Sequence, residues 1–107
     1  MKRYCQTLEL VNDQELIKQY CDIHAHVWPE VVEGQRQVGI LDMQIYRWEN
    51  RVFMICDTVD DFDWENDMAR LARLPRQAEW EAFVARCQGA DPNLPSTGKW
   101  HLMERIF

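Results

Sequence analysis

The chain has 107 residues, 47% of them hydrophobic, and a formal net charge of −6 at pH 7. This length fits a single domain over residues 1–107, and the hydrophobic content excludes an intrinsically disordered chain. The acidic balance and the scattered lysine and arginine residues exclude a nucleic-acid partner, and the lack of a long apolar run excludes insertion into a membrane.

The first third of the chain predicts a strand and two helical segments. Residues 2–10 alternate apolar and polar side chains, as in a half-buried strand. Asn12 is a suitable N-cap with a glutamate three residues later, so a helix should begin there and continue to Trp28. Pro29 disfavours the α conformation for the residue before it and is itself favoured at a helix start. A second helical segment should therefore cover 29–37.

A β-hairpin should follow these helices, once Gly39 has closed the second one. Residues 40–48 and 51–58 both alternate apolar and polar side chains. The tight turn between them falls at Glu49–Asn50. Because alternate side chains of a strand share a face, one face of the first strand should carry three apolar residues: Leu41, Met43 and Ile45.

The second half of the chain predicts two more helices, a loop and a closing strand. Asp60–Asp61 can cap the first helix, and the second should run from Pro75 to Gly89. Residues 90–98 are rich in proline, serine and glycine and should form a loop, and residues 99–107 should form the last strand. Apolar side chains at helical spacing mark the buried stripes of the two helices: Trp64, Met68 and Leu71, then Trp80, Phe83, Val84 and Cys87.

Strands and helices in this order predict an α+β protein with the β-α-β-β-α-β topology called ferredoxin-like. The helices should cover one face of the sheet. The apolar side chains of the other face also need a cover, which a second copy would supply by packing sheet against sheet. We therefore expect a homodimer that forms a dimeric α/β barrel.

The stretch Tyr20–Glu30 holds the densest group of chemically useful side chains. Tyr20 and His24 share the apolar stripe of their helix, so a hydroxyl and an imidazole one turn apart should face inward. His24 could act as a general acid and base at neutral pH, and Tyr20 could hold a hydroxyl group of a ligand. The alternative is a core histidine bonded to a backbone carbonyl, with Tyr20 packed beside it.

The sequence gives less reason to expect a functional role for the remaining histidines, His26 and His101. His26 points away from His24 on a regular helix, and this spacing is poor for chelation. A metal site of His24, His26 and Glu30 is a minor alternative that requires the helix to break before Pro29. We expect no metal, and His101 should be structural or exposed to solvent.

The four cysteines show no metal-binding spacing. With no export signal visible, the chain should be cytoplasmic and its thiols reduced, serving as small apolar filler. The alternatives are a reactive thiol or a bridge between Cys5 and Cys56.

Trp80 lies on the inward stripe of the last helix, and Glu79 is its neighbour. A tryptophan ring beside a carboxylate suits a sugar, because the sugar's C–H face stacks on the ring while its hydroxyl groups need polar partners. The alternative is an ordinary core tryptophan. No phosphate-binding loop, nucleophile elbow or dinucleotide fingerprint is present, so we expect cofactor-free chemistry or binding alone.

A set of motifs is spread over nearly the whole chain: Tyr20-x-x-x-His24-x-x-x-Trp28-Pro29-Glu30, Gly39, Ile45-Tyr46, Asp63-Trp64, Trp80, Asp91-Pro92-Asn93 and Met103–Phe107. In these motifs the chain resembles the L-rhamnose mutarotase family, a group of small enzymes of sugar catabolism. The similarity runs nearly from end to end, and its most specific part is the Tyr20–Glu30 stretch.

The resemblance implies a dimeric α+β barrel with one cofactor-free sugar site in each subunit. It implies that His24 is the proton donor and that Tyr20 binds the sugar. The family also uses a tyrosine of the second strand and a pair of tryptophans on the last helix. These correspond here to Met43 and to Glu79 and Trp80, which become the other expected substrate-binding residues.

The implied activity is that of an isomerase, a mutarotase that interconverts the α and β anomers of a 6-deoxy-L-sugar. We expect L-rhamnose as the substrate, with L-fucose as the alternative. A non-catalytic dimer that binds a small ligand is also open. Cofactor-free monooxygenases and haem-degrading proteins use the same barrel, but nothing in this sequence indicates a reaction with oxygen or binding of haem.

Overall fold

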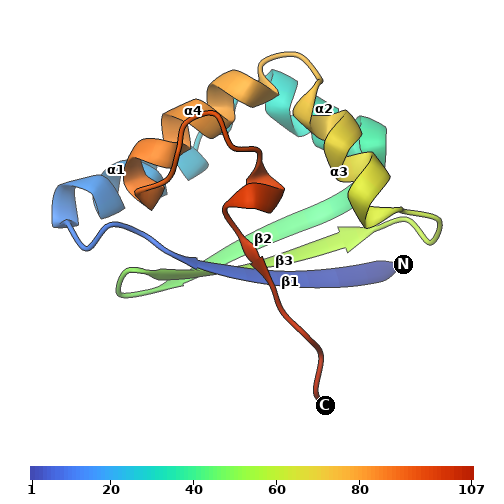
Figure 1. Cartoon of the computed structure of the whole chain (residues 1–107), viewed down its shortest axis with the longest axis horizontal. Coiled ribbons are helices and arrows are strands. Elements are labelled where there is room, and N and C mark those ends of the chain that lie inside the picture. Colours follow the sequence, from blue (N-terminus) through green and yellow to red (C-terminus); the bar gives the residue numbers. More distant parts are fainter.

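An antiparallel sheet of four strands carries four helices on one of its faces (Figure 1). The computed structural model describes all 107 residues. The strand order is β2-β3-β1-β4, which is the ferredoxin-like order and confirms the predicted fold class. The elements are β1 (Lys2–Glu9), α1 (Gln14–His24), α2 (Pro29–Val38), β2 (Ile40–Trp48), β3 (Arg51–Thr58), α3 (Trp64–Ala72), α4 (Gln77–Gln88), the 3₁₀ turn η1 (Ser96–Gly98) and β4 (His101–Leu102).

Helix α1 is shorter at both ends than the sequence predicts. Its N-cap is Asp13 and not Asn12, because the Asp13 carboxylate accepts the N–H groups of Glu15 and Leu16 at 2.9 and 3.1 Å. It ends at His24 and not at Trp28. Trp28 has ψ 133°, the extended conformation imposed on a residue before proline, so the chain leaves the helix early and restarts at α2.

The junction between α2 and β2 requires a glycine. Gly39 has φ +101°, in the left-handed region, and its N–H closes the helix on the carbonyl groups of Gln35 and Arg36. A Cβ atom there would lie 2.8 Å from Cγ2 of Val59. This tight turn brings β2 back under α2.

The β2–β3 hairpin has the predicted bounds, with one irregularity near its start. A register shift between Ile40 and Asp42 inserts an extra residue into β2. Leu41 lies at this shift and is 60% exposed, whereas Met43 and Ile45 are half-buried; all three line the cavity described below.

The second half of the chain departs from the prediction at three boundaries. Helix α3 is capped by Asp63, which accepts the N–H of Asn66 at 3.1 Å, and not by Asp60–Asp61. Helix α4 begins at Gln77 and ends, as predicted, at Gly89. The last strand has only two residues, since β4 pairs with the sheet edge at β1 over just two positions. The chain beyond it leaves the sheet on the side away from the helices (Figure 1).

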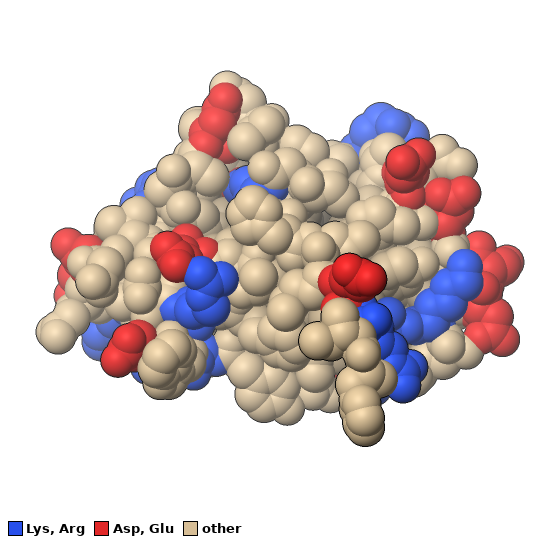
Figure 2. Space-filling model, turned by 60° about the horizontal axis from the view of Figure 1, so that its bottom comes forward, with Lys and Arg blue, Asp and Glu red and all other residues tan.

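The two faces of the sheet differ in composition. The helix-covered face packs Leu8, Val52 and Met54 into the core beneath the helices. The opposite face, called the open face below, carries paired charges and exposed rings such as Tyr46 and Trp48. In Figure 2, which turns this side forward, uncharged side chains occupy much of the middle and charged ones lie mostly around them.

The cysteines are all free, and the predicted alternative of a Cys5–Cys56 bridge is wrong. Cys56 is paired across the strands with Tyr4, so Cys5, the next residue, points to the opposite face of the sheet. Burial raises the pKa of the Cys56 thiol to about 12, which keeps it protonated and inert. Cys21 is exposed, against the expectation that it fills the core. No helix has both the length and the apolar character needed to cross a membrane.

Candidate functional site

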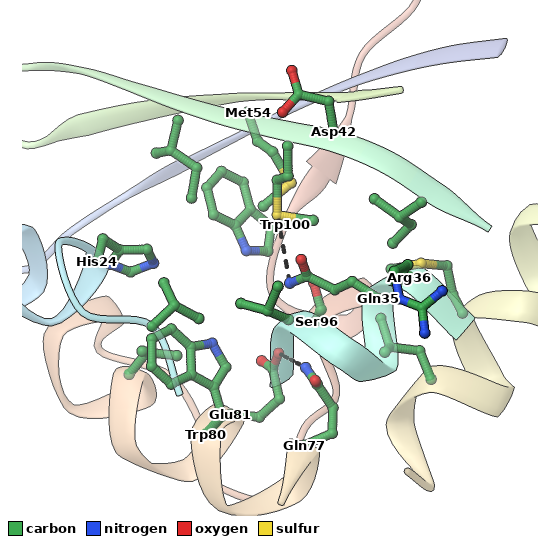
Figure 3. A pocket seen from close by; sticks show the side chains of 18 of the residues that line it. His24, Gln35, Arg36, Asp42, Met54, Gln77, Trp80, Glu81, Ser96 and Trp100 are labelled. Atoms are coloured by element: carbon green, nitrogen blue, oxygen red, sulfur yellow. Dashed lines mark hydrogen bonds between the residues drawn. The ribbon is translucent and has the colours of Figure 1, made fainter. Parts of the chain in front are cut away.

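A cavity of about 490 Å³ lies between the helices and the helix-covered face of the sheet (Figure 3). This volume falls in the range of ~300–1,000 Å³ typical of small-molecule sites. Its wall is mainly apolar, with a few polar groups that could orient a ligand. The lining residues that matter below are Tyr20, His24, Gln35, Met43, Gln77, Trp80, Glu81, Gln88 and Trp100.

His24 is the last residue of α1 and lines this cavity, as the helical spacing predicts. Its Nδ1 lies 2.7 Å from the backbone oxygen of Tyr20. A carbonyl oxygen can only accept, so Nδ1 must carry the proton of the neutral ring. The lone pair of the neutral imidazole is then on Nε2, which makes this atom the proton acceptor. The bond to a backbone carbonyl, foreseen as the inert alternative, thus also fixes the tautomer that a base requires.

The surroundings keep His24 neutral. Burial lowers the pKa of its imidazole below the ordinary value of 6.5, and the bond to the Tyr20 carbonyl opposes this only in part. The centroid of the imidazole ring lies 4.3 Å from that of the Tyr20 ring and 5.4 Å from that of the Trp80 ring. The contact with Trp80 is edge-on, with an angle of 74° between the ring planes. Held by these contacts, the imidazole is an oriented base at neutral pH.

Tyr20 is buried and lines the same cavity. Burial raises the pKa of its phenol strongly, and the neighbouring Gln88 amide opposes this shift. The phenol therefore stays protonated and can donate a hydrogen bond throughout the neutral range.

Glu79 and Trp80 are neighbours in the sequence, but only Trp80 lines the cavity. Trp80 lines the cavity, and its ring also meets the ring of Trp28 edge-on at 5.2 Å. The side chain of Glu79 is 65% exposed, lies outside the cavity wall and approaches Arg76 at 3.5 Å. Glu79 therefore makes no contact with the cavity that would support the substrate-binding role expected for it.

Met43 of β2 lines the cavity from the sheet side. Its sulfur lies 3.9 Å from Nε2 of Gln35 (Figure 3). A thioether is a weak acceptor, so Met43 offers a soft apolar surface to a ligand.

Sequence reasoning missed the most polar part of the wall, which α4 and the segment before β4 supply. Glu81 projects into the cavity beside Trp80 and accepts a hydrogen bond from Gln77 at 2.9 Å (Figure 3). Lys99 forms an ion pair with it at 2.7 Å. Trp100 adds a second buried tryptophan. Helical spacing gave no indication of this role, because Glu81 lies about 100° from Trp80 on one side just as Glu79 does on the other.

Other candidates lie away from this cavity. His26 and His101 are exposed, and neither lines it. Glu30 approaches Arg76 and has no contact with His24 or His26. No group of three His, Cys, Asp or Glu side chains is arranged to hold a metal ion, so the metal alternative has no geometric support.

The cavity thus joins a neutral base, a buried hydroxyl donor, aromatic walls and a buried carboxylate. Such a set can move a proton between two oxygen atoms of a small neutral ligand and hold its hydroxyl groups. Tyr20 and His24 come from α1, and Trp80 and Glu81 come from α4. The packing of these two helices therefore sets the distance between the base and the polar wall.

Comparison with known sequences points to one family. The model of the L-rhamnose mutarotase family matches residues 3–107. An L-fucose mutarotase of Xanthomonas campestris pv. campestris is 39% identical over 109 residues, which cover 100% of this chain and 87% of that protein. A UPF0734 protein of Dictyostelium discoideum is 35% identical over 102 residues, covering 92% of this chain and 82% of that protein.

Comparison with solved structures supports the fold. The crystal structure of an L-rhamnose mutarotase from Formosa agariphila aligns with a TM-score of 0.76 at 20% identity, covering 100% of this chain and 97% of the other. The tetracenomycin F2 cyclase of Streptomyces glaucescens, a type II polyketide cyclase, aligns with a TM-score of 0.62 at 14% identity, covering 100% and 95%. At such low identities these two likenesses concern the fold alone.

Proposed function

The chain belongs to the L-rhamnose mutarotase family and is a sugar mutarotase, and on this premise we propose that it interconverts the α and β anomers of a 6-deoxy-L-sugar. L-Rhamnose is the first expected substrate and L-fucose the second. The observation that carries the proposal is the neutral His24 imidazole, with its tautomer fixed by the Tyr20 carbonyl, at the wall of a cavity of sugar-binding character.

The reaction needs one proton to move between two oxygen atoms of the sugar. Nε2 of His24 takes the proton from O1, and the electron pair left on O1 forms the carbonyl at C1 as the C1–O5 bond breaks. The imidazolium then returns the proton to O5, which gives the open-chain aldehyde. Rotation about C1–C2 and the same steps in reverse close the ring on the other face of C1. Positioned proton transfer of this kind contributes about 10²–10⁴-fold.

The other residues would bind and orient the sugar. The Tyr20 phenol, protonated because it is buried, would donate a hydrogen bond to a sugar oxygen. The Trp80 ring would stack on the apolar C–H face of the sugar, and Met43 would contact the ring from the sheet side.

The direct test is saturation-transfer NMR of anomer exchange with L-rhamnose, L-fucose and other 6-deoxy-L-sugars. Purified wild-type protein should accelerate exchange of at least one of them, and the ratio of rates would rank the two favoured sugars. Exchange at the uncatalysed rate for every sugar, with sugar-induced shifts of the melting temperature, would support a non-catalytic binding protein instead.

We also propose that the protein is a homodimer joined through the open face of the sheet. That face leaves Tyr46 and Trp48 exposed. The C-terminal end of the chain, which carries the exposed residues Ile106 and Phe107, leaves the sheet on the same side (Figure 1). A second copy packed on this face would bury these aromatic and aliphatic side chains. Light scattering should give about twice the 12.9 kDa mass of one chain, and a monomer at micromolar concentration would contradict the proposal.

A further inference from the structure

We propose that Glu81, ion-paired to the buried Lys99, is the residue that selects the sugar: it accepts a hydrogen bond from a ring hydroxyl group away from C1, and Gln77 beside it accepts one from the adjacent hydroxyl group. Only the identity of the ligand as a sugar rests on the proposed function. Neither the helical stripe of α4 nor the resemblance to the family assigns a role to Glu81 or to Lys99.

The stability of the fold alone does not require a buried ion pair between Lys99 and Glu81. The side chains of Lys99 and Glu81 are 1% and 9% exposed. Removing two charges from water is costly, and well-packed apolar residues in place of such a pair are often as stable or more so. Glu81 lies in the cavity wall and is not part of the apolar core, so its carboxylate can contact a ligand.

The carboxylate has hydrogen-bonding capacity left for such a ligand. It offers about four acceptor positions. Nε2 of Gln77 occupies one on Oε1 at 2.9 Å, and Oε2 forms the ion pair with Nζ of Lys99 at 2.7 Å. Each oxygen keeps a second position, and Figure 3 shows the group facing the space below Trp100 and Gln35. Sugar hydroxyl groups are the neutral donors that fit.

The neighbouring amide explains why two hydroxyl groups fit better than one. The bond to Glu81 directs the nitrogen of Gln77 toward the carboxylate, and its oxygen Oε1 is left buried with no partner. An unpaired buried acceptor is unfavourable. A second hydroxyl group, adjacent on the ring to the one bound by Glu81, would supply the missing donor.

Lys99 acts as a positioning residue. Its Nζ also donates to the backbone oxygen of Glu81 at 2.8 Å, which ties the segment before β4 to α4 and fixes the carboxylate. The ammonium group also balances the charge of Glu81. The wall therefore presents acceptors without a strong net field, which favours a neutral sugar over a sugar acid or a sugar phosphate.

The test compares Glu81→Gln with Glu79→Gln, two isosteric changes two residues apart on α4. Binding of L-rhamnose and L-fucose is measured by calorimetry, together with the 2-, 3- and 4-deoxy analogues of the sugar that binds. Glu81→Gln should weaken binding of the parent sugar about ten- to a hundredfold, as expected for hydrogen bonds to a charged group, and Glu79→Gln should not. The analogues that lack a contacted hydroxyl should bind wild type weakly, with little further loss in Glu81→Gln.

A double variant separates a loss of sugar binding from a loss of folding. Glu81→Gln with Lys99→Met removes both charges, so it should keep a wild-type melting temperature within a few degrees and bind as weakly as Glu81→Gln alone. Wild-type affinity in either folded Glu81 variant, across the whole set of sugars, would overturn the inference. Binding that depends on Glu81 without any anomer exchange would support it while rejecting the proposed activity.

Discussion

On the open face of the sheet, polar side chains are bonded to one another, whereas at the cavity under the helices two side-chain oxygens have no partner within the chain. Arg3 bonds both oxygens of Asp57 at 2.7 and 3.0 Å, and the Tyr46 hydroxyl donates to Gln44 at 2.9 Å. At the cavity, the side-chain oxygens of Gln77 and Gln88 are buried without a donor.

The difference shows where a ligand can gain binding energy. A hydroxyl group arriving at the open face would have to displace an existing bond or compete with water. A hydroxyl group arriving at the cavity could satisfy an acceptor that folding has left unpaired. Variants of the cavity should therefore affect exchange of the sugar, and matched variants elsewhere should not.

The largest effect is expected from removing the base. His24→Gln should lower the rate of anomer exchange about 10²–10⁴-fold, because the amide cannot take up the O1 proton. Exchange is read by saturation-transfer NMR at saturating sugar.

The matched control is His26→Gln, two residues along and exposed. It should leave exchange unchanged. Equal losses in both variants, or none in either, would remove His24 from the mechanism.

The next effect is the dependence on pH. Because burial lowers the pKa of His24 below 6.5, the neutral base persists at pH values where a free imidazole is half protonated. Exchange should stay on its plateau at pH 6.5 and fall about tenfold per unit of pH below the pKa of the folded protein.

The same shift affects stability. A histidine whose folded pKa is lower than its unfolded value stabilises the fold above pH 6.5, and this stabilisation is lost as the pH falls from there through the folded pKa. The melting temperature should fall over this interval in wild type and less in His24→Gln. Parallel curves for the two proteins would contradict this assignment.

Local spacing was enough to predict the inner face of α1. Tyr20 and His24 lie one turn apart on an apolar stripe, and the structure brings both to the cavity. The hairpin bounds were predicted for the same reason, since alternation and a two-residue turn are local features.

Spacing could not distinguish Glu79 from Glu81. Each lies one residue from Trp80, about 100° to either side of the stripe, so a helical wheel treats them alike. What separates them is a contact from far along the chain, because Lys99 arrives beside α4 and pairs with Glu81. The short last strand was missed for a related reason, as its length depends on the edge of β1.

A smaller effect is expected from the buried phenol. Tyr20→Phe keeps the ring that packs on His24 and removes one hydrogen-bond donor. Sugar affinity should fall about two- to tenfold, the usual range for a single neutral hydrogen bond. Calorimetry with the preferred sugar measures it.

The control for this change is Tyr46→Phe, whose hydroxyl lies on the open face and bonds Gln44. It should not alter sugar affinity. A greater loss from Tyr46 than from Tyr20 would show that the ligand binds the open face, and the comparison of the two faces would be reversed.

The smallest effect is expected from the paired charges of the open face. Arg51→Ala removes the partner of Glu9 and a bond to Thr7, yet both charged side chains are largely exposed and the pair is screened by salt. The free energy of unfolding, measured with urea, should fall by less than about 1 kcal/mol, and the difference should shrink in 1 M NaCl. Anomer exchange should be unchanged. Because Glu9 ends β1 and Arg51 begins β3, the pair lies at the rim of the open face. A loss of several kcal/mol that grows with protein concentration would mean that the proposed dimer interface extends over this rim and buries the pair.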